Sequence, residues 1–329
     1  MGNDVFFQRE AFEIIRNGHN LLLLGAAGTG KTHLIKHIVK TLQEENKNVS
    51  VTASTGIACC LYTNAQTIHR WSGIGDGRYG KDEIQNVVRN NANFASNRKS
   101  INRTDVLVID ECSMISKRFF LCLDEVCKLR NPNLPFGGIQ IVLAGDFTQL
   151  PPVPSALLGD EGEFCFESEL FREAFPHRVV LKEVLRQTEV ELIHAIQEVS
   201  MGHISSQTVD FIKTLQRPLP PHDENVKLFS SNNKVDEYNR LKVVEFPGQL
   251  YEFKSRDEGD KGHLVKMLAP QTLWLKIGVP VILIRNITDV LVNGLRGEVS
   301  DITEDGPVIS FKSVNMTVPM EKLSFSGKA

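Results

Sequence analysis

A glycine-rich loop that ends in lysine and threonine is the most informative chemical feature of this 329-residue sequence. The run Gly25-Ala26-Ala27-Gly28-Thr29-Gly30-Lys31-Thr32 follows four leucines and precedes a helical pattern. Its spacing fits G-x-x-x-x-G-K-[ST], in which backbone N–H groups and a helix N-terminus hold phosphates. Lys31 would then reach the β- and γ-phosphates, and the Thr32 hydroxyl would bind Mg²⁺. The sequence therefore predicts that this chain binds a nucleoside triphosphate.

Two acidic residues follow a later apolar run. Asp110 and Glu111 come directly after residues 106–109, which are Val-Leu-Val-Ile. In P-loop ATPases a carboxylate at the end of such a strand holds Mg²⁺, and a second acid can polarise the attacking water. An acidic pair after a strand is by itself more often a solvated turn. Behind a phosphate-binding loop it indicates hydrolysis, with Thr32 and Asp110 as the metal-binding residues.

A polar turn over 145–152 follows another apolar run. Its Gln149 amide could donate to a γ-phosphate and also orient a water molecule. Pro151 and Pro152 would stiffen the exit from the turn because proline fixes the backbone φ angle. The alternative is a plain proline turn.

The elements that must position these residues alternate between short apolar runs and helical patterns. The apolar runs are continuous, which is typical of parallel strands buried on both faces and predicts an α/β domain. The expected strands are 21–24, 49–53, 106–109, 139–144 and 178–181. The expected helices are 4–16, 31–45, 113–129 and 168–174.

The stretch 75–103 interrupts this alternation. It is polar, rich in Asn and Gly, and locally basic, which predicts either a surface insertion with a function or a solvated loop. Further on, a helix over 189–201 leads to a proline-rich linker at 217–221. A second α/β unit should follow, with strands at 227–229 and 279–284 and a helix at 234–244. The alternating tail over 297–325 predicts a β-hairpin element.

Composition sets limits on function. The net charge of −3 gives no global sign of nucleic-acid binding, so any such function must depend on local features. Six cysteines without a C-x-x-C pair argue against a structural zinc site and for a reducing compartment. No apolar run reaches 18 residues, and the N-terminus carries no signal-peptide pattern. We expect no membrane contact and a nuclear or cytoplasmic protein, with the mitochondrion still open.

These motifs together resemble the Pif (petite integration frequency) family of DNA helicases, in the RecD-like branch of superfamily one. The T-A-S-T-G, T-I-H and G-D-F-x-Q-L-P-P-V segments distinguish this family from other P-loop proteins. Nearly the whole chain matches in the family's order. The matching segments are 25–32, 52–56, 67–75, 110–114, 135–140, 145–152 and 185–187, with weaker matches at 230–239 and 291–297.

The resemblance implies two RecA-like P-loop domains, each a parallel sheet flanked by helices, with small inserted β elements. The first would span 1–185, with the basic insertion 76–103 in the place of the family's wedge domain. The second would span 186–296 and be incomplete, and a β-hairpin element would occupy 297–329. We find no match to the family's I-H-K-S-Q-G-like coupling segment.

The resemblance also implies roles for single residues. Gln8 matches the adenine-binding glutamine, and Arg186 matches an arginine that reaches the γ-phosphate. Residues along a single-strand groove would contact DNA, with Trp71 either stacking on a base or forming part of the core. These residues are Ser54, Thr55, His69, Trp71 and Asn293.

The implied activity is that of an ATP-dependent 5′-to-3′ DNA helicase that uses ATP and Mg²⁺. The partners would be single-stranded and forked or structured DNA, the protein would be a monomer, and the processes served would be DNA repair, recombination and telomere maintenance. One alternative is a nucleotide- and DNA-binding module with DNA-stimulated ATPase activity but no unwinding. Another is a P-loop enzyme that does not use nucleic acid, such as a small-molecule kinase.

Overall fold

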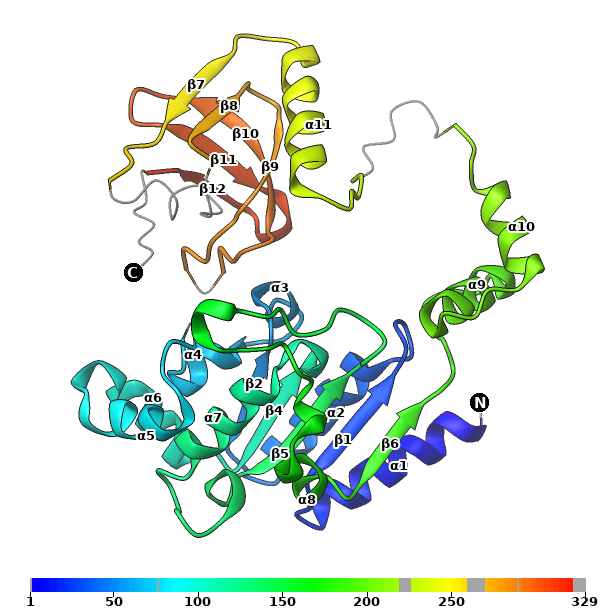
Figure 1. Cartoon of the computed structure of the whole chain (residues 1–329), viewed down its shortest axis with the longest axis vertical. Helices are drawn as coiled ribbons and strands as arrows, with labels where there is room; N and C mark the ends of the chain where they lie inside the picture. Colours follow the sequence, from blue (N-terminus) through cyan, green and yellow to red (C-terminus); the bar gives the residue numbers. More distant parts are fainter. Residues whose placement is uncertain (1, 76, 219–225, 259–269, 289, 322–329) are drawn as a thin grey trace. The chain divides into compact units, whose positions relative to one another are not determined.

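The computed structural model describes the chain except residues 1, 76, 219–225, 259–269, 289 and 322–329, and only the backbone of residues 2–8. The chain divides into two compact units, 1–217 and 218–329 (Figure 1). The division falls at Arg217 and Pro218, whereas we expected a domain boundary at 185/186.

The first unit is built on a six-stranded parallel sheet with the strand order β3-β2-β4-β5-β1-β6. Its five longer strands confirm the predicted ones to within a residue at each end. The short β3 was not predicted, because two residues carry no periodic signal. The strands are β1 (Leu21–Gly25), β2 (Val49–Ala53), β3 (Gln66–Thr67), β4 (Val106–Asp110), β5 (Gln140–Gly145) and β6 (Arg178–Leu181).

Helices cover both faces of this sheet (Figure 1). Successive side chains of a strand point to opposite faces, so Leu21 and Leu23 join one buried cluster and Leu22 joins the other. The first cluster packs on α1 (Gly2–Arg16) and α2 (Lys31–Glu44). The second packs mainly on α7 (Lys117–Cys127) and α8 (Glu169–Ala174). Helix α7 begins later than predicted, since the Ser116 side chain caps it by accepting from the Phe119 N–H.

The insertion within the first unit is helical. Helices α5 (Lys81–Asn90) and α6 (Ala95–Arg103) carry Ile84, Val88 and Ile101, which are fully buried in the second cluster. The solvated-loop alternative is therefore wrong for this segment. Ile84 and Val88 lie one helical turn apart, and α5 packs against α7.

Four more α-helices among the described residues belong to the first unit. The short helices α3 (Gly56–Cys59) and α4 (Ile68–Ser72) follow β2 and β3. Helix α9 (Val190–Met201) confirms the helix predicted at 189–201, and α10 (Ser206–Thr214) is capped by the Ser205 hydroxyl. Helices α9 and α10 pack on each other, and the first compact unit extends beyond residue 185 to residue 217.

The second unit combines α11 (Asn232–Glu245) with antiparallel strands. Strands β7 (Tyr251–Lys254) and β8 (Thr272–Leu275) form a pair. A four-stranded sheet contains β9 (Pro280–Ile282), β10 (Arg296–Ile302), β11 (Pro307–Phe311) and β12 (Met316–Pro319). The predicted helix at 234–244 and the β structure of the tail up to residue 321 are confirmed. Residues 322–325 of the predicted tail lie outside the described residues.

The strand predicted at 227–229 is wrong, since those residues form no regular structure. Leu228 is 93% exposed, so the apolar run that suggested a buried strand is not buried in this unit. All strand pairs in the described part of the second unit are antiparallel.

Candidate nucleotide-binding site and nucleic-acid interface

The loop between β1 and α2 has a backbone that only glycines adopt easily. Gly28 and Gly30 have φ angles of +82° and +89°, in the left-handed region. A Cβ atom at Gly25 would lie 2.6 Å from Thr29 Oγ1 and 2.8 Å from the Leu181 carbonyl. Gly30 is the N-cap of α2 and supplies no side-chain cap, so first-turn N–H groups are available to an anion. This geometry suits phosphate.

The ammonium group of Lys31 lies at the mouth of this loop. Its Nζ donates to the Gly25 carbonyl at 2.5 Å and to the Ala26 carbonyl at 3.0 Å. Burial lowers the pKa of Lys31, while the charges of Asp146, Glu111 and Asp110 act in the opposite direction. The loop lysine and three carboxylates therefore share one site.

Asp110 ends β4 and is 2% exposed. Its Oδ1 accepts from the Glu111 N–H at 2.9 Å, and its Oδ2 accepts from the Tyr62 hydroxyl at 2.5 Å. Its carbonyl accepts from the Ser54 N–H at 3.1 Å. These bonds fix the carboxylate at the carboxyl edge of the sheet, where ligands of open α/β sheets bind.

Glu111 follows with a φ angle of +55°, an unusual backbone conformation for a residue with a side chain. Burial and the neighbouring Asp110 raise the pKa of Glu111, and Lys31 opposes that shift. A carboxylate with a raised pKa is a better proton acceptor at neutral pH. The arrangement suits activation of water.

Asp146 is a site residue that the sequence analysis missed. Its Oδ2 accepts from Gln149 Nε2 at 2.9 Å, and its Oδ1 accepts from the Thr148 hydroxyl at 2.7 Å. Burial raises the pKa of Asp146, but the hydrogen bonds from Gln149 and Thr148 and the charge of Lys31 outweigh burial and lower it. Asp146 follows β5, which pairs with β4, so adjacent parallel strands were the signal that could have revealed it.

The segment around Arg186 packs over the phosphate loop. The Leu185 and Arg186 N–H groups donate to the Gly28 carbonyl at 2.8 and 3.2 Å. A Cβ atom at Gly28 would lie 2.8 Å from the Arg186 Cβ. The Arg186 side chain is exposed beside the loop. Lys31, Asp110 and Gln149 thus meet at one edge of the sheet, with Arg186 next to them.

Two further predicted contacts concern adenine and the metal. Gln8 belongs to α1, but its side chain lies outside the described residues. Among the described residues, no cluster of three or more His, Cys, Asp or Glu could hold a metal ion. The pair Thr32 and Asp110 still fits Mg²⁺, because Mg²⁺ sites often use one or two protein ligands together with substrate phosphates.

Three of the predicted DNA-contacting residues lie beside this edge. Ser54 follows β2, and its hydroxyl is buried without a hydrogen-bond partner. The Thr55 hydroxyl caps α3 by accepting from the Ala58 N–H at 3.4 Å. His69 packs on Phe119 with 4.4 Å between ring centroids, and burial lowers its pKa. Their DNA contacts stay a prediction.

The stacking role considered for Trp71 is wrong. Trp71 is 1% exposed and belongs to the core cluster that contains α7. A side chain buried in this way offers no face to a base, so the alternative of a core tryptophan holds. Asn97 on α6 donates to the Trp71 carbonyl at 3.1 Å, which attaches the helical insertion to α4.

Asn293 belongs to the second unit. It lies between β9 and β10, and its side chain is exposed. The Asn293 N–H forms no hydrogen bond of a strand pair. It donates to Asn286 Oδ1 at 2.7 Å. The proposed contact of Asn293 with DNA stays a prediction.

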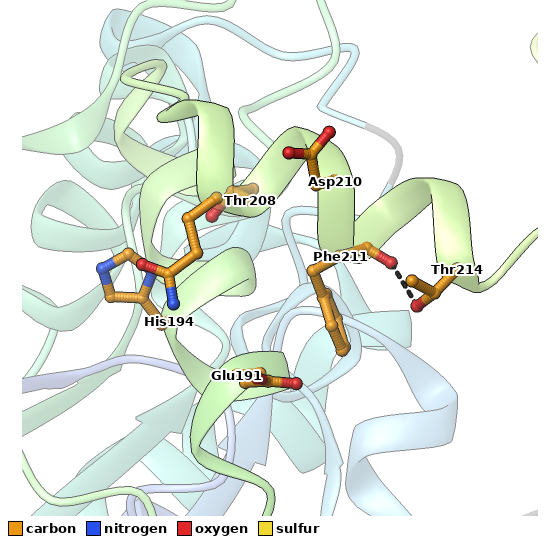
Figure 2. A pocket seen from close by; sticks show the side chains of 7 residues that line it. Glu191, His194, Thr208, Asp210, Phe211 and Thr214 are labelled. Carbon is orange, nitrogen blue, oxygen red and sulfur yellow. Dashed lines mark hydrogen bonds between the residues drawn. The ribbon is translucent and has the colours of Figure 1, made fainter.

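A pocket between α9 and α10 is a separate feature (Figure 2). The Thr214 hydroxyl donates to the Phe211 carbonyl at 2.6 Å on one wall. The lining includes two carboxylates and neither lysine nor arginine, which disfavours phosphate binding. The lining residues are Glu191, His194, Gln207, Thr208, Asp210, Phe211 and Thr214.

Comparison with family models gives two matches. Residues 6–210 match the model described as PIF1-like helicase. Residues 264–302 match the model described as DNA helicase Pif1, 2B domain. The second match spans the predicted boundary at 296/297.

Individual proteins and structures agree with these matches. The chain is 37% identical over 303 residues to the ATP-dependent DNA helicase PIF1 of Emericella nidulans, covering 87% of this chain and 40% of that protein. It is 30% identical to the ATP-dependent DNA helicase RRM3 of Saccharomyces cerevisiae, covering 94% and 43%. The crystal structure of Pif1 helicase from Candida albicans aligns with a TM-score of 0.78 at 32% identity, covering 96% and 78%. The chain spans less than half the length of these curated relatives.

Proposed function

This chain belongs to the PIF1-like helicase family, and we propose that it hydrolyses ATP to move 5′ to 3′ along single-stranded DNA and separate forked duplexes. The substrates would be ATP with Mg²⁺ and single-stranded, forked or structured DNA. Such an activity would serve DNA repair, recombination and telomere maintenance. We further infer that the chain acts as a monomer.

The observation that carries this proposal is the charge arrangement around Lys31. Three carboxylates, Asp110, Glu111 and Asp146, act electrostatically on one ammonium group at the mouth of a phosphate-binding loop. A glycine turn without a ligand would not require this group of opposite charges at one sheet edge. A nucleotide with a metal ion would complement them.

Each side chain has a chemical task in this proposal. The loop amides and Lys31 hold the phosphates, and Lys31 would exchange its two carbonyl contacts for phosphate oxygens. Glu111 accepts a proton from the attacking water. Gln149 and Arg186 would bind the terminal phosphate, where a guanidinium stabilises developing charge.

Thr32 and Asp110 would hold the Mg²⁺ ion, which neutralises phosphate charge when it is bound with ATP.

A hydrogen bond connects the nucleotide site with the proposed DNA groove. The Ser54 N–H donates to the carbonyl of Asp110, so the residue after β2 is tied to the residue that would hold the metal. Thr55 follows and begins α3. A shift at the end of β4 would therefore reach the DNA-contacting segment directly, which is a physical route for coupling hydrolysis to grip on DNA.

The test is ATP hydrolysis by the purified chain and two site variants. We expect Lys31→Ala and Glu111→Gln each to abolish hydrolysis measured in the presence of single-stranded DNA. Matched controls are Lys40→Ala and Glu44→Gln, which change exposed residues of α2 away from the loop. If both site variants hydrolyse ATP like the parent chain, the site assignment is wrong.

The module without unwinding activity is the second candidate. It is favoured by the second unit, in which the described strands pair only in antiparallel fashion and form no RecA-like parallel sheet. A forked-duplex assay separates the two candidates. Strand separation driven by ATP supports the helicase, whereas DNA-stimulated hydrolysis without strand separation supports the module.

Two structural facts bear on the cellular environment. All six cysteines are unpaired, which fits the reducing compartment that we infer from their spacing. In the described part of the chain, no helix combines the length and apolar character needed to cross a bilayer. We propose a nuclear or cytoplasmic protein, with the mitochondrion as the alternative.

A further inference from the structure

Tyr62 contacts one of the residues that we assign to the metal ion. Its hydroxyl donates to Asp110 Oδ2 at 2.5 Å. The Glu111 N–H donates to Asp110 Oδ1 at 2.9 Å. Two protein groups therefore hold the Asp110 carboxylate in a short chain of hydrogen bonds.

The ring of Tyr62 is fixed by contacts outside this chain of hydrogen bonds. It packs against the buried cluster of α1, α2 and the sheet. The Lys36 ammonium lies over its face, 5.8 Å from the ring centroid. The Tyr62 N–H donates to the Cys59 carbonyl at 3.0 Å. The phenol is therefore held in place by the protein without help from a nucleotide.

The hydrogen-bond inventory of the carboxylate decides what this arrangement does. Each carboxylate oxygen has about two acceptor sites. Asp110 Oδ2 receives one proton from the Tyr62 hydroxyl and keeps a second acceptor site. The phenol thus orients the carboxylate without using up its capacity to bind a metal.

We propose that Tyr62 is a positioning residue for Mg²⁺, holding the Asp110 carboxylate in the orientation that receives the ion. The inference rests on the proposed nucleotide site. Groups that orient metal ligands from behind typically change metal affinity by about 10–100-fold when they are removed. The fixed ring gives Tyr62 the rigidity that such a role requires.

The experiment measures binding of a non-hydrolysable ATP analogue to the full chain by calorimetry, across a Mg²⁺ titration and in EDTA. The variant is Tyr62→Phe, which keeps the packed ring and removes the hydroxyl. We expect the Mg²⁺ concentration for half-maximal tightening to rise about 10–100-fold. We expect the affinity in EDTA to be unchanged, which a general disturbance of the loop would not allow.

Tyr79→Phe is the matched control, because Tyr79 is a partly buried tyrosine of the same unit that packs on the other core cluster. It should leave both affinities unchanged. If the parent shows Mg²⁺-dependent binding and Tyr62→Phe has the same Mg²⁺ requirement, the role of Tyr62 is refuted. A lower requirement would also refute it, since Tyr62 would then compete with the ion. If the nucleotide affinity of the parent chain does not depend on Mg²⁺, the proposed function itself is overturned.

Discussion

At the scale of single residues, the charged side chains of the site shift one another's pKa values. The charges of three carboxylates act to raise the pKa of Lys31, yet burial still lowers it. Glu111 has a raised pKa because burial and Asp110 disfavour its ionised form. Each of these residues would therefore lose its working charge closer to neutral pH than an isolated side chain does. The pH dependence of hydrolysis follows from the lowered pKa of Lys31 and the raised pKa of Glu111.

We expect a bell-shaped pH profile for ATP hydrolysis. Glu111 accepts a proton only when it is ionised, so the rate falls as pH drops through its raised pKa, above the usual glutamate value of about 4.3. Lys31 binds phosphate best when protonated, so the rate also falls as pH rises through its lowered pKa, below about 10.4. Initial rates across pH, with far-UV circular dichroism to exclude unfolding, measure both limbs. If the rate of ATP hydrolysis does not fall as the pH drops to the value at which the protein unfolds, the role of Glu111 is contradicted.

Gly28→Ala should weaken nucleotide binding. The φ angle of +82° disfavours a side chain, and the new Cβ would lie 2.8 Å from the Arg186 Cβ. The phosphate-binding loop and the segment that contains Arg186 would have to move apart. We therefore expect the dissociation constant of an ATP analogue to rise at least tenfold. Gly202→Ala is the matched control, because Gly202 also has a positive φ, at +71°, but no atom within 4 Å of its Cβ position. Equal affinities in the two variants would count against the packing of Arg186 on the loop.

The sequence assigned roles to several residues of spaced motifs, but it missed Asp146, which lies within one such motif, and Tyr62, which lies in none of them. Lys31, Asp110 and Gln149 stand at fixed positions within recognisable runs. Asp146 and Tyr62 join the site through strand pairing and through a hydrogen bond across 48 positions of sequence. Trp71 was ambiguous because an aromatic residue in a motif suits a base and a core equally well.

At the scale of elements, the helical insertion shows that a segment with few apolar residues can still pack on a core. Polar and basic residues dominate 76–103, and composition alone suggested a loop or a functional surface. Ile84 and Val88, one helical turn apart on α5, and Ile101 on α6 are buried in the second core cluster. The continuous apolar strands gave a stronger signal, and their prediction was correspondingly close.

Ile84→Ala tests the packing of α5. Ile84 is fully buried, so removing most of its side chain leaves a cavity and should lower the free energy of unfolding of the first unit by about 2–5 kcal/mol. Asn86→Ala, an exposed change in the same helix, should alter it by less than about 0.5 kcal/mol. Urea denaturation followed by circular dichroism measures both. Equal stabilities of the two variants would mean that α5 does not pack as described.

At the scale of the whole molecule, the sequence indicated two parts and the structure has two compact units, but their division differs from the expected one. The proline-rich run at 217–221 lies at the observed division, whereas the motif order suggested residue 185. Helices α9 and α10 carry no chemical motif, and they pack on each other within the first compact unit. The domain boundary that the motif order indicates stays a prediction, and the proline-rich run coincides with the division into compact units.

The most direct measurement is the rate of ATP hydrolysis by the intact chain with and without single-stranded DNA, at saturating Mg²⁺ and ATP. The net charge of −3 makes non-specific attraction to DNA a poor explanation for any stimulation. We predict a several-fold higher rate with DNA, lost in Glu111→Gln. A measurable rate that DNA leaves unchanged would contradict the account and favour a P-loop enzyme that does not use nucleic acid.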